Sequence, residues 1–207
     1  MGETSHVYLT AAEVAKLAEL CDMATGEDSR AAKQGDVVLI LAYTGLRFGE
    51  LTGLNVEDVD LQARRIRVRR SITQCLVASL EGPPKSRAGR RSVPIPERLG
   101  PILKRRIEGR MAGQPAIMSP KGSRLGIENW KRAVGWRTRI VELGRPTMRV
   151  HDLRHTYASL ARSAGADMKL LQVTMGHASI MVTAHTYADL YDSDLDRVAN
   201  ALDGLGD

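Results

Sequence analysis

The hexapeptide HDLRHT at residues 151–156 is the stretch around which the rest of the chain is organised. It places His151 and Arg154 three residues apart, so a helix would carry both on one face. A histidine behind a glycine, His177, and a tyrosine, Tyr187, follow further along the chain. Arginine, histidine and tyrosine together suit one task, which is to hold a phosphate diester while a phenol attacks it. The remaining sequence should supply what that reaction still lacks.

Composition indicates a globular chain with a basic balance. The 207 residues suffice for one domain, and a hydrophobic content of 43% with 26% charged residues is ordinary. The net charge of +6 leans toward a polyanionic partner. Cys21 and Cys75 are too few for a disulfide framework and fit a reducing cytoplasm. We expect no membrane span and no secretion signal, and the histidines lack the cysteines or acidic cluster of a metal site, so we predict no metal.

Helical periodicity covers most of the chain. Thr10 followed by Glu13 forms a capping box, so a helix should begin there, after residues 1–9 as a linker remnant or disordered lead. The apolar run 37–43 predicts a buried helix, and a glycine turn then brings Arg47 to the start of another. Further helices are expected over residues 97–110, 127–143, 152–164 and 167–175, and an apolar stripe at 195–202 marks a helical tail over 192–207.

The middle of the chain changes to the periodicity of strands. Residues 64–70 alternate, with Ile66 and Val68 on one face and arginines on the other. Residues 92–96 predict a short return strand, and Lys85 lies at the turn between the two. We therefore expect a small antiparallel sheet within residues 56–96, packed at one side of a helical core. The fold class is α+β and mainly helical.

Five motifs, taken in order, resemble the catalytic domain of the tyrosine recombinases, the phage integrase family. They are TGLRFGEL at 44–51, PKSRAGRRSVP at 84–94, HDLRHT at 151–156, GH at 176–177 and TY at 186–187. One such motif alone is weak, because His-x-x-Arg occurs often by chance, but five in order are specific. The resemblance runs to residue 191, so we expect a recombinase catalytic domain over residues 10–191.

The resemblance implies which residues handle the phosphate. Arg47 and Arg154 would be the two arginines that clamp it, and His177 would hydrogen-bond one of its oxygens. Glu50 would be a supporting acidic residue that orients this cluster. Planar, permanently charged guanidinium groups are well matched to phosphate oxygens.

The resemblance also implies how the strand is cut. Tyr187 would be the nucleophile that makes a 3′-phosphotyrosyl link and frees a 5′-hydroxyl. His151 would handle the tyrosine proton, and Lys85 would protonate the 5′-oxygen as it leaves. The family needs neither a metal nor another cofactor. Because a phosphotyrosyl bond can be resealed, strand exchange is favoured over simple hydrolysis.

Other residues of the same types have simpler interpretations. His155 lies beside Arg154 and is interpreted as structural or supporting, so it stays outside the catalytic set. His185 is expected at the surface, and Tyr191 falls too late in the sequence to be the nucleophile. Tyr43 and Tyr157 sit in apolar runs and should belong to the core.

Basic side chains could follow the backbone of a DNA duplex, giving affinity that falls with salt but little sequence information. For the strand arginines a merely solvated face is an equally open interpretation. Aromatic residues are too few for a platform that stacks single-stranded bases. The candidate DNA-binding residues are Arg65, Arg67, Arg69, Arg87, Arg90, Arg91, Lys131 and Arg132.

The function that the resemblance implies is site-specific recombination of double-stranded DNA, in the cytoplasm and at the nucleoid of a bacterial host. The alternatives are a type IB topoisomerase-like DNA relaxing enzyme and a non-catalytic DNA-binding accessory protein. Relatives usually carry an N-terminal DNA-binding domain, so a chain without one should bind DNA weakly. The resemblance implies a homotetramer on DNA, or a monomer for an isolated domain, with the tail over 192–207 docking on its own domain or on a neighbouring protomer.

Overall fold

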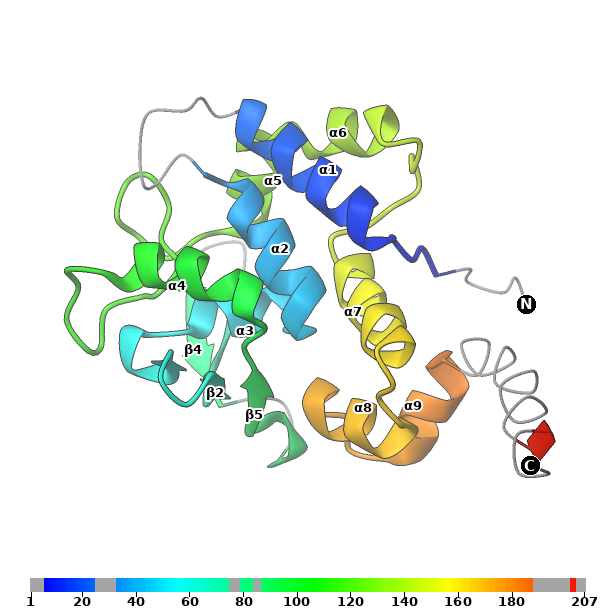
Figure 1. Cartoon of the computed structure of the whole chain (residues 1–207). Helices are drawn as coiled ribbons and strands as arrows, with labels where there is room; N and C mark the ends of the chain where they lie inside the picture. The colour runs from blue at the N-terminus through cyan, green and yellow to red at the C-terminus, as the bar shows by residue number, and fades with distance from the viewer. Residues whose placement is uncertain (1–5, 25–32, 75–78, 84–86, 188–201, 204–207) are drawn as a thin grey trace.

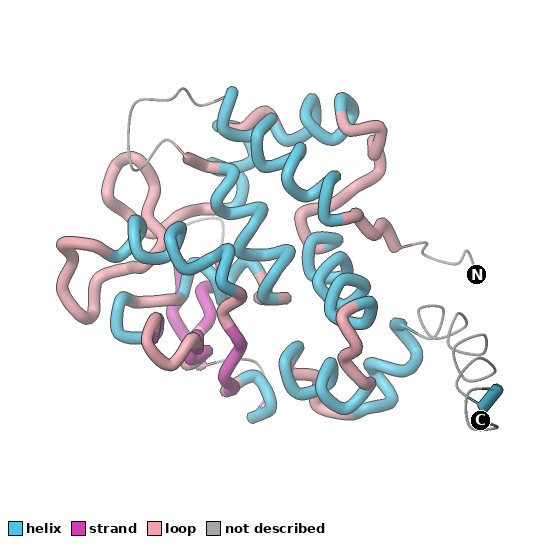
Figure 2. The backbone as a smooth tube through the Cα atoms, in the orientation of Figure 1, coloured by secondary structure: helices cyan, strands magenta, loops and turns pink. Residues whose placement is uncertain are grey.

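The computed structural model describes residues 6–24, 33–74, 79–83, 87–187 and 202–203. In these ranges helices form the body of the molecule and short antiparallel strands gather at one side of it (Figure 1). Figure 2 shows the same segregation, with the strands beneath the helical part. The prediction of a mainly helical α+β fold with a small antiparallel sheet is confirmed.

The first two helices follow their sequence signals. Helix α1 (Ala11–Met23) begins at the predicted capping box, in which Thr10 and Glu13 satisfy each other's backbone amides. Helix α2 (Gly35–Thr44) is apolar on nearly every side and packs between α1 and the later helix α7. The described part of the N-terminal lead, expected as a linker remnant or disordered lead, packs against the domain. Leu9 is buried, and its backbone amide donates to Thr156 Oγ1 at 3.1 Å.

The strands form two sheets rather than the single sheet predicted. In the first, β2 (Arg65–Val68) pairs antiparallel with β1 (Val59–Asp60) and with β5 (Arg91–Pro94), the predicted return strand. In the second, β3 (Ser71–Gln74) pairs with β4 (Ser79–Gly82). Residues 69–70 separate β2 from β3, and the guanidinium of Arg70 donates to Asp58 Oδ2 at 2.7 Å.

One predicted helix is two helices. Residues 127–143 divide into α5 (Ile127–Ala133) and α6 (Trp136–Glu142). Gly135 between them adopts φ +60°, a left-handed conformation that interrupts the helical hydrogen bonds. The predicted helix at 97–110 is shorter than expected, with a 3₁₀ turn at Glu97–Leu99 followed by α4 (Gly100–Ile107).

The last three described helices build one side of the candidate site. They are α7 (Asp152–Ser163), α8 (Met168–Met175) and α9 (Ile180–Tyr187). Helix α8 ends at Gly176, directly after the predicted helix 167–175. Helix α8 contacts both β5 and α9, so the sheet and the end of the chain meet around it.

None of the described helices has the length and apolarity needed to cross a bilayer. The predicted tail helix at 195–202 lies almost entirely outside the described residues.

Candidate active site

Arg154 is the centre of the site and is held from two directions. It lies in the first turn of α7, and only 2% of it is exposed. Its guanidinium donates to the carbonyl oxygens of Gly45, at the C-terminal end of α2, and of Met175, at the end of α8. Carbonyls at helix C-termini lack helical partners and carry partial negative charge, so they are good acceptors for an arginine.

A glycine makes this arrangement possible. Gly45 adopts φ +65° and ends α2, and a Cβ at this position would lie 2.4 Å from the ring of Tyr157. Only a residue without a side chain can both adopt this conformation and let α7 approach so closely. The glycine turn that the sequence predicted therefore also sets the position of Arg154.

Arg47 belongs to the same site and is the N-terminal capping residue of α3 (Phe48–Gly53). The side chain of Arg47 is 42% exposed, and its Nη1 donates to Glu50 Oε1 at 3.0 Å. Burial, followed by the positive charge of Arg47, lowers the pKa of Arg154 to about 9, although Glu50 opposes the change. The pocket thus concentrates positive charge, and an entering anion would relieve that repulsion.

Glu50 is shared by two arginines. It is 1% exposed, and Arg91 donates to its two carboxylate oxygens at 2.9 Å each. Burial alone would raise the pKa of Glu50, but the hydrogen bonds and charge of Arg91 hold it below its usual value. Glu50 therefore stays ionised and keeps Arg47 in place.

Arg91 was predicted to contact DNA, and the structure contradicts that prediction. Its side chain is only 3% exposed, and besides Glu50 it donates through Nε to Thr174 O at 2.6 Å. Gly176 lies against it, since a Cβ there would fall 2.9 Å from Arg91 Nη1. Arg91 is thus a buried link between β5, α3 and the end of α8.

Tyr187 ends helix α9 with its side chain inside the molecule. It is 1% exposed, and its hydroxyl lies 2.9 Å from Nδ1 of His155. The ring is stacked nearly parallel to that of His177, with 6.3 Å between centroids and an angle of 8°. Burial raises the pKa of the Tyr187 phenol, while the charges of Arg154 and Arg47 partly oppose this. The phenol therefore stands within the electrostatic reach of both arginines.

His155 is the residue that the sequence interpretation placed outside the site. It contacts the phenol directly, whereas the hydrogen bond that the structure gives for Tyr187 does not involve His151. His151 is the N-terminal capping residue of α7, and its ring lies edge-on to His155 at 5.0 Å. The spacing of these two histidines, four residues apart on one helix, was a signal that could have identified His155.

The histidines of the pocket are held neutral. Burial, then the charges of Arg154 and Arg47, lowers the pKa of His177 to about 4. His177 Nδ1 lies 2.9 Å from Thr183 Oγ1, which fixes the ring. Burial and Arg154 also lower the pKa of His151. A neutral imidazole leaves the positive charge of the pocket to the arginines.

The structure thus brings together residues from four separate segments, which are Arg47, Glu50, His151, Arg154, His177 and Tyr187. Lys85 and Tyr191 lie outside the described residues, and so does the side chain of Arg87. His185 is exposed and Tyr157 is buried, as expected, while Tyr43 is half-buried beneath the guanidinium of Arg98.

The other candidate DNA-binding residues differ in whether an acidic side chain already pairs with them. Arg67 pairs with Asp60 at 2.9 Å, and Arg69 lies 3.6 Å from Asp58. Arg65 is exposed and donates to the backbone oxygen of Arg64. Arg90 and Arg132 are exposed, and Lys131 pairs with Glu128 at 3.0 Å.

Comparison of the sequence with known proteins identifies a family and several relatives. The model of the phage integrase family matches residues 7–194. A prophage integrase of Mycobacterium tuberculosis is 34% identical over 148 residues, which cover 69% of this chain and 39% of that protein. The tyrosine recombinase XerC of Thermodesulfovibrio yellowstonii is 30% identical over 195 residues, covering 88% of this chain and 58% of XerC. The chain therefore spans less than two thirds of these relatives.

Solved structures show the same fold. The Tn1549 transposon integrase, in complex with circular intermediate DNA, superposes with a TM-score of 0.69 at 26% identity, covering 95% of this chain and 68% of that one. The catalytic domain of bacteriophage HP1 integrase gives a TM-score of 0.60 at 22% identity, with 95% of each chain covered. Fold and site together define a domain of the tyrosine recombinase class. The chain belongs to the phage integrase family.

Proposed function

We propose that the chain is the catalytic domain of a site-specific DNA recombinase that cuts and rejoins strands through a covalent 3′-phosphotyrosyl intermediate. The observation that carries this proposal is the placement of the Tyr187 phenol within the field of Arg154 and Arg47. A nucleophile and two cationic groups around one pocket are the minimum that transfer of a phosphodiester requires. The family membership supports the same reading.

In the proposed reaction the Tyr187 oxygen attacks the phosphorus, the phenolic proton passes to His151, and the bond to the 5′-oxygen breaks. Arg154 and Arg47 hold the non-bridging oxygens as negative charge builds on them, and the neutral His177 adds a hydrogen bond. Lys85 gives its proton to the departing 5′-oxygen. The reverse attack by a 5′-hydroxyl regenerates the phenol and joins the strands, so no external energy source is needed.

Arg154 suits the clamp because its own position does not depend on the substrate. Two helix C-termini hold the guanidinium before DNA arrives. Donors that are already oriented need no rearrangement when charge develops, and this is the main source of electrostatic catalysis. Arg47, with its side chain 42% exposed, is free to follow the phosphate.

The DNA-binding surface is proposed to comprise the basic residues that remain accessible. These are Arg65, Arg67, Arg69, Arg90, Lys131 and Arg132. Arg87, whose side chain lies outside the described residues, is proposed for the same surface from the sequence. Such residues contact the phosphate backbone and give affinity with little sequence preference. We propose a homotetramer on DNA as the working assembly, the tail over 192–207 as a contact between protomers, and the bacterial nucleoid as the place of action.

The test is covalent trapping on a DNA substrate that is nicked beside the scissile phosphate. After cleavage the short fragment diffuses away, so the strand cannot be resealed and the covalent intermediate accumulates. A protein–DNA adduct that resists denaturation supports the proposal. DNA binding without any adduct would instead support an accessory protein. Relaxation of supercoiled plasmids that lack a recombination site would favour a topoisomerase-like enzyme.

A further inference from the structure

The phenol of Tyr187 and the imidazole of His155 meet across the interior of the site. His155 lies on α7 and Tyr187 at the end of α9, 32 residues apart in sequence, and Tyr187 Oη is 2.9 Å from Nδ1. Both residues are buried, at 6% and 1% exposure. Water therefore cannot easily replace either partner, and the contact determines where the phenolic oxygen lies.

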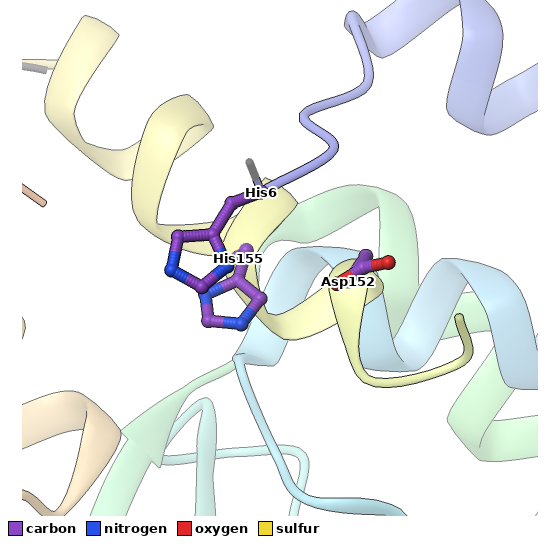
Figure 3. A group of neighbouring side chains, drawn as sticks. All are labelled: His6, Asp152 and His155. Atoms are coloured by element: carbon purple, nitrogen blue, oxygen red, sulfur yellow. The ribbon is translucent and has the colours of Figure 1, made fainter. Parts of the chain in front are cut away.

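The N-terminal lead fixes the other side of the His155 ring. His6 stacks on it, with 4.0 Å between centroids and 29° between planes. Figure 3 shows the two imidazoles face to face, His6 from the lead and His155 from α7. The lead is held in turn by the bond from the Leu9 amide to Thr156. With His6 over one face and His151 against its edge, the His155 ring has little freedom to rotate.

A metal site is the competing interpretation of this cluster. One potential ligand atom from each of His6, Asp152 and His155 lies within 4.8 Å of the others. The carboxylate of Asp152, however, accepts from the backbone amide of Arg149 at 2.7 Å and from its Nη2 at 3.0 Å. The field of Arg154 reaches His155 as well. A divalent cation would have to displace one arginine and approach another, so we assign no metal here.

Both partners of this hydrogen bond are uncharged at neutral pH. Burial, then the charges of His6 and His151, lowers the pKa of His155 to about 3, so its ring is neutral at neutral pH. Burial raises the pKa of Tyr187, so the phenol keeps its proton. Both groups are therefore neutral, and the phenol donates to His155 Nδ1 in the tautomer that carries its ring proton on Nε2.

We propose that His155 is a positioning residue, which accepts the phenolic hydrogen bond and holds the Tyr187 oxygen beside the arginines that receive the phosphate. The inference rests on the proposed function for its catalytic consequence, but the contact itself does not depend on it. His6 contributes by keeping the imidazole at the required angle. His155 is not the final acceptor of the phenolic proton, since so weak a base would take it poorly.

Two variants separate the acceptor from the shape of the ring. His155→Phe keeps a ring that can stack on His6 but has no acceptor. His155→Asn loses the ring but can place an amide oxygen near the position of Nδ1. We expect His155→Phe to lower the rate of single-turnover cleavage on nicked DNA about tenfold or more, because a misplaced nucleophile is costly. His155→Asn should recover most of the rate, and both variants should bind DNA as the wild type does.

A second measurement needs no catalytic activity. Nitration of tyrosine by tetranitromethane, followed by peptide mass spectrometry, reports how often the Tyr187 ring becomes accessible. Losing one neutral hydrogen bond should raise its nitration about three- to tenfold in His155→Phe, with a smaller rise in His155→Asn. Tyr43, which pairs with Arg98 on another surface, is the internal control and should not change.

The outcomes are distinct. If the wild type forms no adduct on DNA, the proposed function fails, and the nitration comparison still decides whether His155 holds the phenol. Unchanged nitration in His155→Phe would overturn the inference whatever the cleavage assay shows. Equal loss of cleavage in the Phe and Asn variants would also overturn it, since the acceptor would then not be the feature that matters.

Discussion

Arg91 donates two hydrogen bonds of 2.9 Å to the carboxylate of Glu50, 41 residues away in sequence, and both side chains are almost fully buried. Glu50 in turn holds Arg47, while Arg91 also reaches the end of α8. One ion pair therefore connects three parts of the site. They are strand β5, helix α3 with Arg47 at its start, and the end of α8 before His177. A change at this pair should affect both stability and the site.

Arg91→Ala should destabilise the fold. It leaves the Glu50 carboxylate buried without its main partner, and breaking a buried pair in this way costs about 3–5 kcal/mol. Denaturant unfolding measures the effect. The neighbouring Arg90 is exposed, so Arg90→Ala should leave the unfolding free energy within about 0.5 kcal/mol of the wild type. Equal stability of the two variants would contradict the buried role of Arg91.

The same pair predicts how stability depends on pH. The folded pKa of Glu50 is held below its ordinary value of 4.5, so its contribution is fully present above that value and is lost as pH falls through the lower, folded pKa. Unfolding free energy should therefore fall below pH 4.5. Glu50→Gln should be less stable at pH 7 but should lose less on acidification. Parallel curves for the two proteins would rule out this origin.

The two clamp arginines should differ in what their loss costs. Arg47→Lys changes a partly exposed side chain, so the free energy of unfolding should change little. The rate of cleavage should fall about 10²-fold, because lysine cannot donate two hydrogen bonds to one phosphate as arginine does. Arg154→Lys should lower both, because lysine cannot reach the carbonyls of Gly45 and Met175 together. Thermal unfolding and single-turnover cleavage of the two variants test this contrast. If Arg154→Lys were as stable as Arg47→Lys, the anchoring by helix ends would be unimportant.

Salt dependence of DNA binding should distinguish two neighbouring strand arginines. Arg65→Ala should reduce the slope of log K against log salt by about one unit, as expected for loss of one phosphate contact. Arg67→Ala should reduce it less, because Asp60 lies 2.9 Å from Arg67 and already neutralises part of its charge. Filter binding or fluorescence anisotropy at several salt concentrations provides the slopes. Identical slopes for wild type and Arg65→Ala would place that face of β2 away from the duplex.

Local signals in the sequence predicted the elements that carry the site. Thr10 with Glu13 marked a helix start, the alternation at 64–70 marked a strand, and Gly45 and Gly176 marked helix ends, because each depends on neighbouring residues alone. The break at Gly135 was missed, since a glycine inside an apolar helical pattern is often tolerated.

The sequence could not reveal contacts between side chains that are far apart along the chain. Nothing near Arg91 distinguishes it from Arg90, and only the fold brings Glu50 to it. His155 was passed over for a similar reason, because its partner Tyr187 is 32 residues away. The roles of the site residues themselves stay predictions, and that of Lys85 concerns a residue outside the described ranges.

The central claim is that the phenol of Tyr187 becomes linked to DNA, and mass spectrometry of the trapped adduct tests it most directly. After nuclease and protease digestion, the modified peptide should carry its nucleotide on Tyr187 and not on Tyr191, and Tyr187→Phe should form no adduct. Attachment at Tyr191, or an adduct that persists in Tyr187→Phe, would contradict the account.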